Sequence, residues 1–246
     1  MKHILVLATR NIGKTVEIRD MLKDFPVEIK NLDDFGPIPE IEEDGDTFDD
    51  NAYKKAAFAA KILGYPAMAD DSGLLVDALN GRPGVRSARY AGENATDEMN
   101  IAKLIKELRE TKEIAEGSDS EKKGSNSENK SENKSEKKAD KNNRNAAFEC
   151  VISIAVPTGA ALTYQGRCEG IILDQPKGEN GFGYDPLFFY PDLGKTFAEL
   201  SIEEKSQISH RGKAFQEIRN EFDKILNWID INMPKFEPVE CRSQCI

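Results

Sequence analysis

The stretch ILVLATRNIGKTVEIRDMLKDF, residues 4–25, decides the fold class of this 246-residue chain. An apolar run at residues 4–8 predicts a strand, and a short polar turn separates it from a segment whose apolar residues have helical spacing. That predicted helix covers residues 15–25, and its apolar positions are Val16, Ile18, Met21, Leu22 and Phe25. A strand that runs directly into a helix is typical of α/β folds.

The rest of the sequence alternates strands and helices without a strict repeat. We expect a helix over residues 49–63, capped by Thr47, and another after Thr96. Near the carboxyl end we expect a short helix capped by Ser201, and then one long amphipathic helix that includes residues 215–229. Strands are predicted at residues 66–69, 147–156, 161–165, 169–173 and 186–190. This order predicts an α/β fold with a mixed sheet rather than a regular βαβ repeat.

A polar segment, residues 116–145, interrupts this pattern. From residue 117 it reads GSDSEKKGSNSENKSENKSEKKADKNNRN, in which a single alanine is the one apolar side chain. Such a composition buries too little apolar surface to offset the entropy lost on folding, so we expect a disordered insertion. The chain then divides into one folded domain over residues 1–232, this insertion within it, and a polar tail at 233–246 that holds Cys241 and Cys245.

The formal net charge of −10 argues against some classes of partner. An acidic protein is a poor match for nucleic-acid polymers, whose binding depends on neutralising phosphates. Small phosphorylated ligands are compatible with it, because a few lysines in a cleft suffice and carboxylates can hold the accompanying metal. No apolar run approaches the ~20 residues that span a bilayer, and the first strand is too short for a signal peptide. We therefore expect a cytoplasmic protein without nucleic-acid-polymer or membrane partners.

The segment Thr9-Arg10-Asn11-Ile12-Gly13-Lys14 joins the first strand to the first helix. Backbone amides at a helix start form an anion site, to which Gly13 adds close approach and Lys14 adds a positive charge. The segment is not a Walker A loop, because its spacing and its order of lysine and hydroxyl residues differ. An ordinary turn with a helix cap is the alternative interpretation.

Acidic residues gather in two places. The run Glu42-Glu43-Asp44-Gly45-Asp46 precedes the second helix and offers oxygen ligands for Mg²⁺, with a solvated acidic loop as the alternative. Asp70 and Asp71 stand at the expected end of the strand at residues 66–69, a costly position for charge that indicates function. Their side chains diverge there, so one carboxylate can ligate a metal while the other anchors the loop or polarises water.

Two later segments offer groups that recognise a nucleobase. The run Gly178-Glu179-Asn180-Gly181-Phe182-Gly183-Tyr184-Asp185-Pro186 presents aromatic faces in a glycine-rich loop, which suits stacking on a base. The run Lys205-Ser206-Gln207-Ile208-Ser209-His210-Arg211 offers hydroxyl, imidazole and guanidinium donors that can read a purine 6-oxo group and N7. The alternatives are a tight hairpin with its aromatic residues in the core, and a helix start with surface charges.

These segments, taken in order with Pro83-Gly84-Val85-Arg86-Ser87-Ala88-Arg89-Tyr90-Ala91-Gly92, closely resemble the non-canonical purine NTP pyrophosphatase family, also called inosine or xanthosine triphosphate pyrophosphatases. The resemblance covers nearly all of residues 2–230 apart from the insertion. It implies an elongated mixed central sheet flanked by helices, with two lobes and a nucleotide cleft between them. It also implies a homodimer, one Mg²⁺ per subunit, and hydrolysis of ITP, dITP and XTP to the monophosphate and pyrophosphate.

The resemblance also implies a role for each matching residue. Asp71 would ligate Mg²⁺ together with Glu42 or Glu43, and would accept the proton of the attacking water with support from Asp70. The triphosphate would be held by Thr9, Asn11, Lys14 and Lys55. Ser72 would contact the substrate, Phe182 would stack on the base, and Asp185, Lys205, His210 and Arg211 would bind its edge. The other substrate-binding positions would be Arg10, Ile12, Gly13, Gly183 and Tyr184.

Selectivity would follow from hydrogen-bond donors that face position 6 of the base. A 6-oxo group accepts their hydrogen bonds, whereas the 6-amino group of adenine would leave buried groups unpaired at ~1–3 kcal/mol each. Two other functions are compatible with this sequence. One is a Maf-like nucleotide pyrophosphatase with another base preference, and the other is a non-catalytic nucleotide-binding protein.

Overall fold

The computed structural model describes residues 3–39, 41, 43–121 and 144–235 of the chain. Within these residues, seven strands form one sheet in the order β2-β1-β3-β4-β5-β6-β7. The strands are β1 (His3–Leu7), β2 (Val27–Asn31), β3 (Ala67–Val76), β4 (Asn145–Ala155), β5 (Ala161–Ile172), β6 (Phe188–Tyr190) and β7 (Lys195–Thr196). β1 is parallel to β2 and β3, and the other neighbouring pairs are antiparallel. The expected mixed sheet is confirmed.

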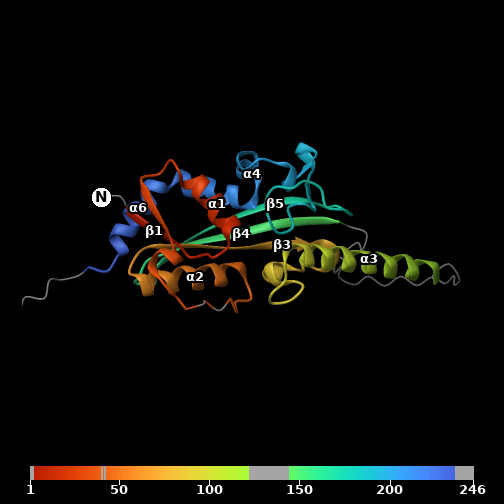
Figure 1. Cartoon of the computed structure of the whole chain (residues 1–246), viewed down its shortest axis with the longest axis horizontal. Coiled ribbons are helices and arrows are strands. Elements are labelled where there is room, and N and C mark those ends of the chain that lie inside the picture. Colours follow the sequence, from red (N-terminus) through yellow and green to blue (C-terminus); the bar gives the residue numbers. More distant parts are fainter. Residues whose placement is uncertain (1–2, 40, 42, 122–143, 236–246) are drawn as a thin grey trace, which may run out of the picture.

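Helices cover both faces of this sheet, and the molecule is elongated along β3, β4 and β5 (Figure 1). α2 and α3 lie on one side of the long strands, whereas α1, α4 and α6 lie on the other (Figure 1). The helices are α1 (Ile12–Leu22), α2 (Phe48–Leu63), α3 (Asp97–Glu121), α4 (Ile202–Ile208), α5 (His210–Asn220) and α6 (Phe222–Asn232). Thr47 caps α2 by accepting the amide of Asp50, and Ser201 and Glu204 form a capping box on α4.

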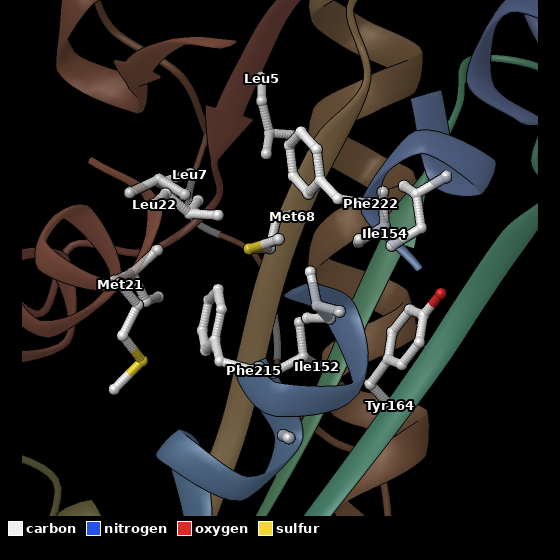
Figure 2. Packing of buried hydrophobic residues seen from close by; sticks show 14 of the residues in the cluster. Leu5, Leu7, Met21, Leu22, Met68, Ile152, Ile154, Tyr164, Phe215 and Phe222 are labelled. Carbon is white, nitrogen blue, oxygen red and sulfur yellow. The ribbon is translucent and has the colours of Figure 1, made fainter. Parts of the chain in front are cut away.

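The buried apolar residues form separate clusters along the long strands. One cluster gathers Met68, Ile152 and Ile154 with residues of α1, α5 and α6, and Figure 2 shows Phe215 and Phe222 packed in it. A second cluster at the other end of the strands includes Leu74, Val76, Phe148, Leu104 and Leu108. On the opposite face, a stripe of fully buried alanines, Ala52, Ala56, Ala59 and Ala60, brings α2 close to β3 and β4. The middle of β3, Asp70 to Gly73, therefore lies between two cores.

The structure corrects the predicted extent of β3. The sequence predicted a strand at 66–69 that ends before the acidic pair, but β3 continues through Asp70 and Asp71 to Val76. β4 pairs with β3 over its whole length, from Ala67 opposite Ala155 to Val76 opposite Ala146. An uninterrupted ladder holds the backbone of the two acids, and cationic side chains neutralise their charges, as described below.

The carboxyl-terminal half differs from the prediction in two places. The predicted strands at 161–165 and 169–173 are one strand, β5, because Gly166 does not form a turn there. A Cβ atom at Gly166 would lie 2.0 Å from the carbonyl oxygen of His210, so glycine allows α5 to pack onto the strand. The predicted long amphipathic helix is two helices, α5 and α6, because the backbone of Glu221 leaves helical geometry at φ −113° and ψ 10°.

The predicted insertion at 116–145 overlaps ordered structure at both edges. α3 continues to Glu121 and β4 begins at Asn145. Once a helix has formed, each added residue gains one backbone hydrogen bond, so a polar segment can prolong it. Residues 122–143 and 236–246, with Cys241 and Cys245, lie outside the described residues, so the predicted disorder and the polar tail stay predictions. In the described part of the chain, no helix is long and apolar enough to cross a membrane.

Candidate functional site

The candidate site lies where β1 stops and leaves an edge of β3 open. β1 pairs with β3 at only two positions, Val6 with Ala67 and Leu7 with Met68, and then turns into α1. Among the described strands, β4 alone therefore flanks the segment from Asp70 to Gly73. Ligands of α/β proteins bind where strands end and the chain turns into helices, near such changes in strand order. A cavity of about 290 Å³ occupies this position.

The cavity brings together most of the residues that the sequence predicted. They come from the loop before α1 and the first turn of α1, the acidic loop before α2 (the loop that contains Glu43), α2, β3, the aromatic loop (residues 178–185), α4 and the start of α5. These lining residues are Thr9, Arg10, Asn11, Lys14, Glu43, Lys55, Asp71, Ser72, Phe182, Gly183, Tyr184, Asp185, Lys205, His210 and Arg211.

Among the described residues, three of those predicted for the site are not part of the cavity lining. Ile12 is 80% exposed and its side chain does not line the cavity. Gly13 contributes through its missing side chain, because a Cβ atom there would lie 2.5 Å from the ring of Phe182. Asp70 is fully buried beneath the cavity, and Glu42 lies outside the described residues.

Asp70 is an anchor for cationic side chains. Arg211 donates to its Oδ2 from Nε at 3.1 Å and from Nη2 at 2.7 Å, and the ammonium of Lys14 lies 3.0 Å from its Oδ1. Burial alone would raise the pKa of Asp70, but the charges of Arg211 and Lys14 outweigh burial and hold this pKa well below its usual range. Asp70 is therefore ionised and fixes the position of Lys14 at the cavity wall.

Glu17 completes this cluster and is missing from the sequence prediction. It is buried on α1 and accepts hydrogen bonds from Lys205, at 2.7 Å, and from Arg211. Lys205 also donates to Asp185. Three carboxylates and three cationic groups thus balance one another: Glu17, Asp70 and Asp185 with Lys14, Lys205 and Arg211. The missed signal was the position of Glu17 beside Ile18, at helical spacing from Lys14 and Met21, on the buried face of α1.

These contacts limit what Arg211 can offer a ligand. Its guanidinium donates to Asp70, to Glu17 and, from Nη2 at 3.0 Å, to Oγ of Ser72. Four of its five N–H groups are thereby engaged, since the Asp70 contact uses two of them. Arg211 chiefly organises the site, and one N–H is left for a ligand.

A second group of charges lies on the other face of β3. The ammonium of Lys55 lies 2.7 Å from Oδ1 of Asp71 and 3.2 Å from Oε1 of Glu43. Two carboxylates share this one cation, so the trio has a net charge of −1 and attracts a further cation. Burial raises the pKa of Asp71, and the charge of Lys55 offsets part of that rise. Asn51, also missed by sequence analysis, donates to Asp71 at 3.4 Å and exchanges hydrogen bonds with the backbone of Gly45.

Two arginines hold the acidic loop that carries Glu43. Arg10 donates to the carbonyl oxygen of Ile38 at 2.7 Å, and Arg89 donates to that of Glu43, also at 2.7 Å. Arg10 therefore holds the chain that leads into this loop and also lines the cavity, and its predicted contact with the substrate stays a prediction. Arg89 belongs to the segment quoted above for the resemblance, but nothing in the sequence assigned it a contact.

The opposite end of the cavity is aromatic. The ring of Phe182 packs on Gly13, and Nζ of Lys205 lies 4.9 Å from its centroid. His210 is buried and stacks on Phe148, with ring centroids 4.7 Å apart. Burial, with the charges of Arg211 and Lys205, lowers the pKa of His210 well below its usual value, so its ring is neutral. Tyr184 also lines the cavity, but it is buried and donates to the carbonyl oxygen of Ser87 at 2.9 Å, as the alternative of aromatic residues in the core describes.

The cavity thus has two chemically different ends. One end combines a helix start, two lysines and two carboxylates, which suits phosphates and a hard cation. The other end combines an aromatic face with a neutral imidazole and buried donors, which suits a heterocyclic base.

Comparisons with known proteins match this description. The model of the Ham1 family matches residues 5–119 and 114–221. A protein named dITP/XTP pyrophosphatase from Syntrophobacter fumaroxidans is 51% identical over 230 residues, which is 93% of this chain and 86% of that protein. A second protein named dITP/XTP pyrophosphatase, from Desulfotalea psychrophila, is 51% identical over 240 residues, which is 98% of this chain and 94% of that protein. A solved structure of a HAM1 protein from Coxiella burnetii has a TM-score of 0.73 and 39% identity, and the match covers 90% of this chain and 99% of that one.

Proposed function

Because this chain belongs to the Ham1 family, we propose that it hydrolyses non-canonical purine nucleoside triphosphates, such as dITP, ITP and XTP, to the monophosphate and pyrophosphate. The observation that carries the proposal is the single cavity in which the Asp71, Lys55 and Glu43 trio stands at one end and Phe182 and His210 at the other. A bound triphosphate would reach from the base end to the charged end. The family match favours this function over the Maf-like and the non-catalytic interpretations.

The phosphates would lie against the start of α1. Lys14 stands there, fixed by Asp70. The first backbone amides of a helix have no partner in its hydrogen-bond ladder, and of those in α1 the amide of Lys14 is capped by the side chain of Asn11 at 3.0 Å. Lys55 approaches from α2, which packs on the other face of β3. In phosphoryl transfer, such positioning and charge neutralisation supply most of the rate, because little covalent chemistry is required of the protein.

Asp71 would accept the proton of the water that attacks the α-phosphorus. Its carboxylate lines the cavity, and burial raises its pKa above the usual value for aspartate, which makes it a stronger base. Asn51 and Lys55 hold the two carboxylate oxygens, at 3.4 Å and 2.7 Å. Asp70, one residue away, stays ionised and does not line the cavity, so it supports Asp71 through Lys14 and Arg211 rather than by contact with substrate.

Glu43 and Asp71 would hold one Mg²⁺. The residues fit this ion, because two carboxylates already converge on one positive group, the ammonium of Lys55. In the described part of the chain, no three His, Cys, Asp or Glu residues are grouped as ligands of one metal ion. Two carboxylates suffice for Mg²⁺, because waters and substrate phosphates supply its other ligands. When bound, Mg²⁺ neutralises phosphate charge and polarises water.

Base selectivity would come from the donors at the aromatic end. Lys205 and Arg211 each keep one N–H beyond those that bind Glu17, Asp70, Asp185 and Ser72. A 6-oxo purine accepts such donors, whereas the 6-amino group of adenine leaves donors unpaired at ~1–3 kcal/mol each. Phe182 would stack on the base. The homodimer and the cytoplasmic location implied or expected from the sequence stay predictions.

Pyrophosphate release from dITP, XTP, dGTP and dATP, with Mg²⁺ and with a chelator, tests this function. We expect rapid metal-dependent release from dITP and XTP and weak release from the other two. Equal rates with all four nucleotides would contradict the proposed base selectivity, and release that persists in chelator would contradict the metal requirement. Failure to hydrolyse any of them would overturn the proposed activity.

A further inference from the structure

The aromatic loop, residues 178–185, has little stiffness of its own. Three of its residues are glycines with left-handed backbone angles, φ +86° at Gly178, +78° at Gly181 and +61° at Gly183. Glycine has more backbone freedom to lose than any other residue, so a loop rich in it is positioned by its contacts rather than by its sequence. The placement of Phe182 therefore depends on the groups that hold the neighbouring amides.

Most of these contacts come from the loop itself or from the chain that follows it. The carbonyl oxygen of Ala198 accepts the amides of Glu179 and Asn180, at 3.2 Å and 3.0 Å. The carboxylate of Asp185 accepts the amide of Phe182 at 3.0 Å. None of these hydrogen bonds joins the loop to α3.

Two side-chain hydrogen bonds join the loop to distant parts of the chain: the hydroxyl of Tyr184 donates to the carbonyl oxygen of Ser87, and a second bond holds a backbone amide directly beside Phe182. Asp97 is the first residue of α3, and its Oδ2 accepts the amide of Gly183 at 2.6 Å across 86 residues of sequence. Both residues line the cavity. A hydrogen bond to a carboxylate is about twice as strong as one between neutral groups, so this contact is well suited to hold a glycine-rich loop.

The ring of Phe182 then sits between fixed surfaces. It packs on Gly13 at the start of α1, where a Cβ atom would lie 2.5 Å from the ring, and it lies over the ammonium of Lys205. Asp97 holds the next amide along the chain from the α3 side. We propose that Asp97 is a positioning residue that fixes Phe182 for stacking on the base, and that it acts on the base half of the ligand rather than on its phosphates. This proposal rests on the proposed function, because it takes Phe182 to be the base-stacking residue.

A purely structural role for Asp97 is the competing explanation. An acidic residue in the first turn of a helix stabilises the helix through its dipole, by ~0.3–1 kcal/mol. Glu98 stands in the same turn, carries the same charge and bonds to Thr96 rather than to the aromatic loop. Glu98→Ala is therefore a matched control, because it removes the same dipole interaction and leaves the Gly183 contact in place.

The test measures binding of two probes to the full-length protein by calorimetry. IMP carries a base, whereas inorganic tripolyphosphate carries only the phosphate chain. We expect Asp97→Ala to weaken IMP binding about tenfold and to leave tripolyphosphate binding unchanged. Asp97→Asn keeps a carbonyl oxygen that can accept the Gly183 amide and should restore IMP binding to within about threefold of wild type, and Glu98→Ala should match wild type with both probes.

Hydrogen exchange at residues 178–185, measured without any ligand, gives a readout independent of the activity. We expect faster exchange in Asp97→Ala and wild-type exchange in Glu98→Ala. Equal weakening of both probes by Asp97→Ala, the same loss in Glu98→Ala, or unchanged exchange would overturn the proposal. If the wild-type protein neither binds IMP nor hydrolyses dITP, the proposed function fails, and the exchange comparison alone decides whether Asp97 holds the loop.

Discussion

Replacing Glu17 by glutamine removes one negative charge from the buried cluster of six charged groups. Breaking a buried ion pair typically costs ~3–5 kcal/mol, because the remaining charge is left without compensation. In this cluster each cation that loses Glu17 still has another carboxylate partner, because Lys205 keeps Asp185 and Arg211 keeps Asp70. Glutamine also still accepts one hydrogen bond, so we expect the lower end of the range, ~3 kcal/mol.

Urea unfolding measures this change. For a slope of ~2 kcal/mol per molar urea, a loss of ~3 kcal/mol lowers the midpoint by about 1.5 M. Asp20→Asn is the control on the same helix, since Asp20 pairs with Lys23 at 2.8 Å near the surface and such pairs contribute less than ~1 kcal/mol. A midpoint for Glu17→Gln no lower than that of Asp20→Asn would refute the view that Glu17 holds the two cations in place.

Three further predictions concern stability and the acidic loop. The folded-state pKa of Glu17 is lowered, since Arg211 and Lys205 outweigh burial, so its stabilisation is present above the usual glutamate pKa of ~4.3 and is lost as pH falls through the folded-state value. In acid titrations of the unfolding free energy, the wild type should therefore decline more steeply below pH ~4.3 than Glu17→Gln, and parallel curves would contradict this. Arg89→Met should raise the Mg²⁺ concentration for half-maximal activity several-fold by freeing the acidic loop, whereas Arg82→Met, which removes a surface contact with Glu107, should not. Gly166→Ala should lower the unfolding free energy by about 1–3 kcal/mol, because its Cβ would meet the backbone of α5 at 2.0 Å, and a wild-type melting temperature would exclude that clash.

Local sequence signals predicted the parts of the fold that depend on neighbouring residues. The cap of α2 at Thr47 and the capping box of Ser201 and Glu204 are formed as expected, because such motifs act within one helical turn. The convergence of the predicted segments is explained by their positions at element ends, around the open edge of β3. The roles of the individual residues stay predictions.

Features that depend on contacts between residues far apart in the sequence could not be predicted from it. The acidic pair predicted the end of a strand, because charge is unfavourable inside a buried strand. In the structure the pair lies within β3, where Lys14, Lys55 and Arg211 neutralise it. Glu17 and its two cations lie 188 and 194 residues apart in sequence, so no local pattern shows their contact. A glycine between two apolar runs is typical of a turn, which is why the sequence predicted two strands. In the structure, Gly166 lies within β5 and lets α5 pack closely on the strand, a contact that the sequence does not show.

The central claim is that Asp71 supports pyrophosphate release from a non-canonical purine triphosphate. The most direct test is product analysis of dITP turnover with Mg²⁺, in the wild type and in Asp71→Asn, which keeps the size of the side chain and removes its charge. We expect the wild type to form dIMP and pyrophosphate in equal amounts, and the variant to lose activity by orders of magnitude while its circular dichroism is unchanged. Formation of dIDP and phosphate by the wild type, or near-normal turnover in the variant, would contradict the account.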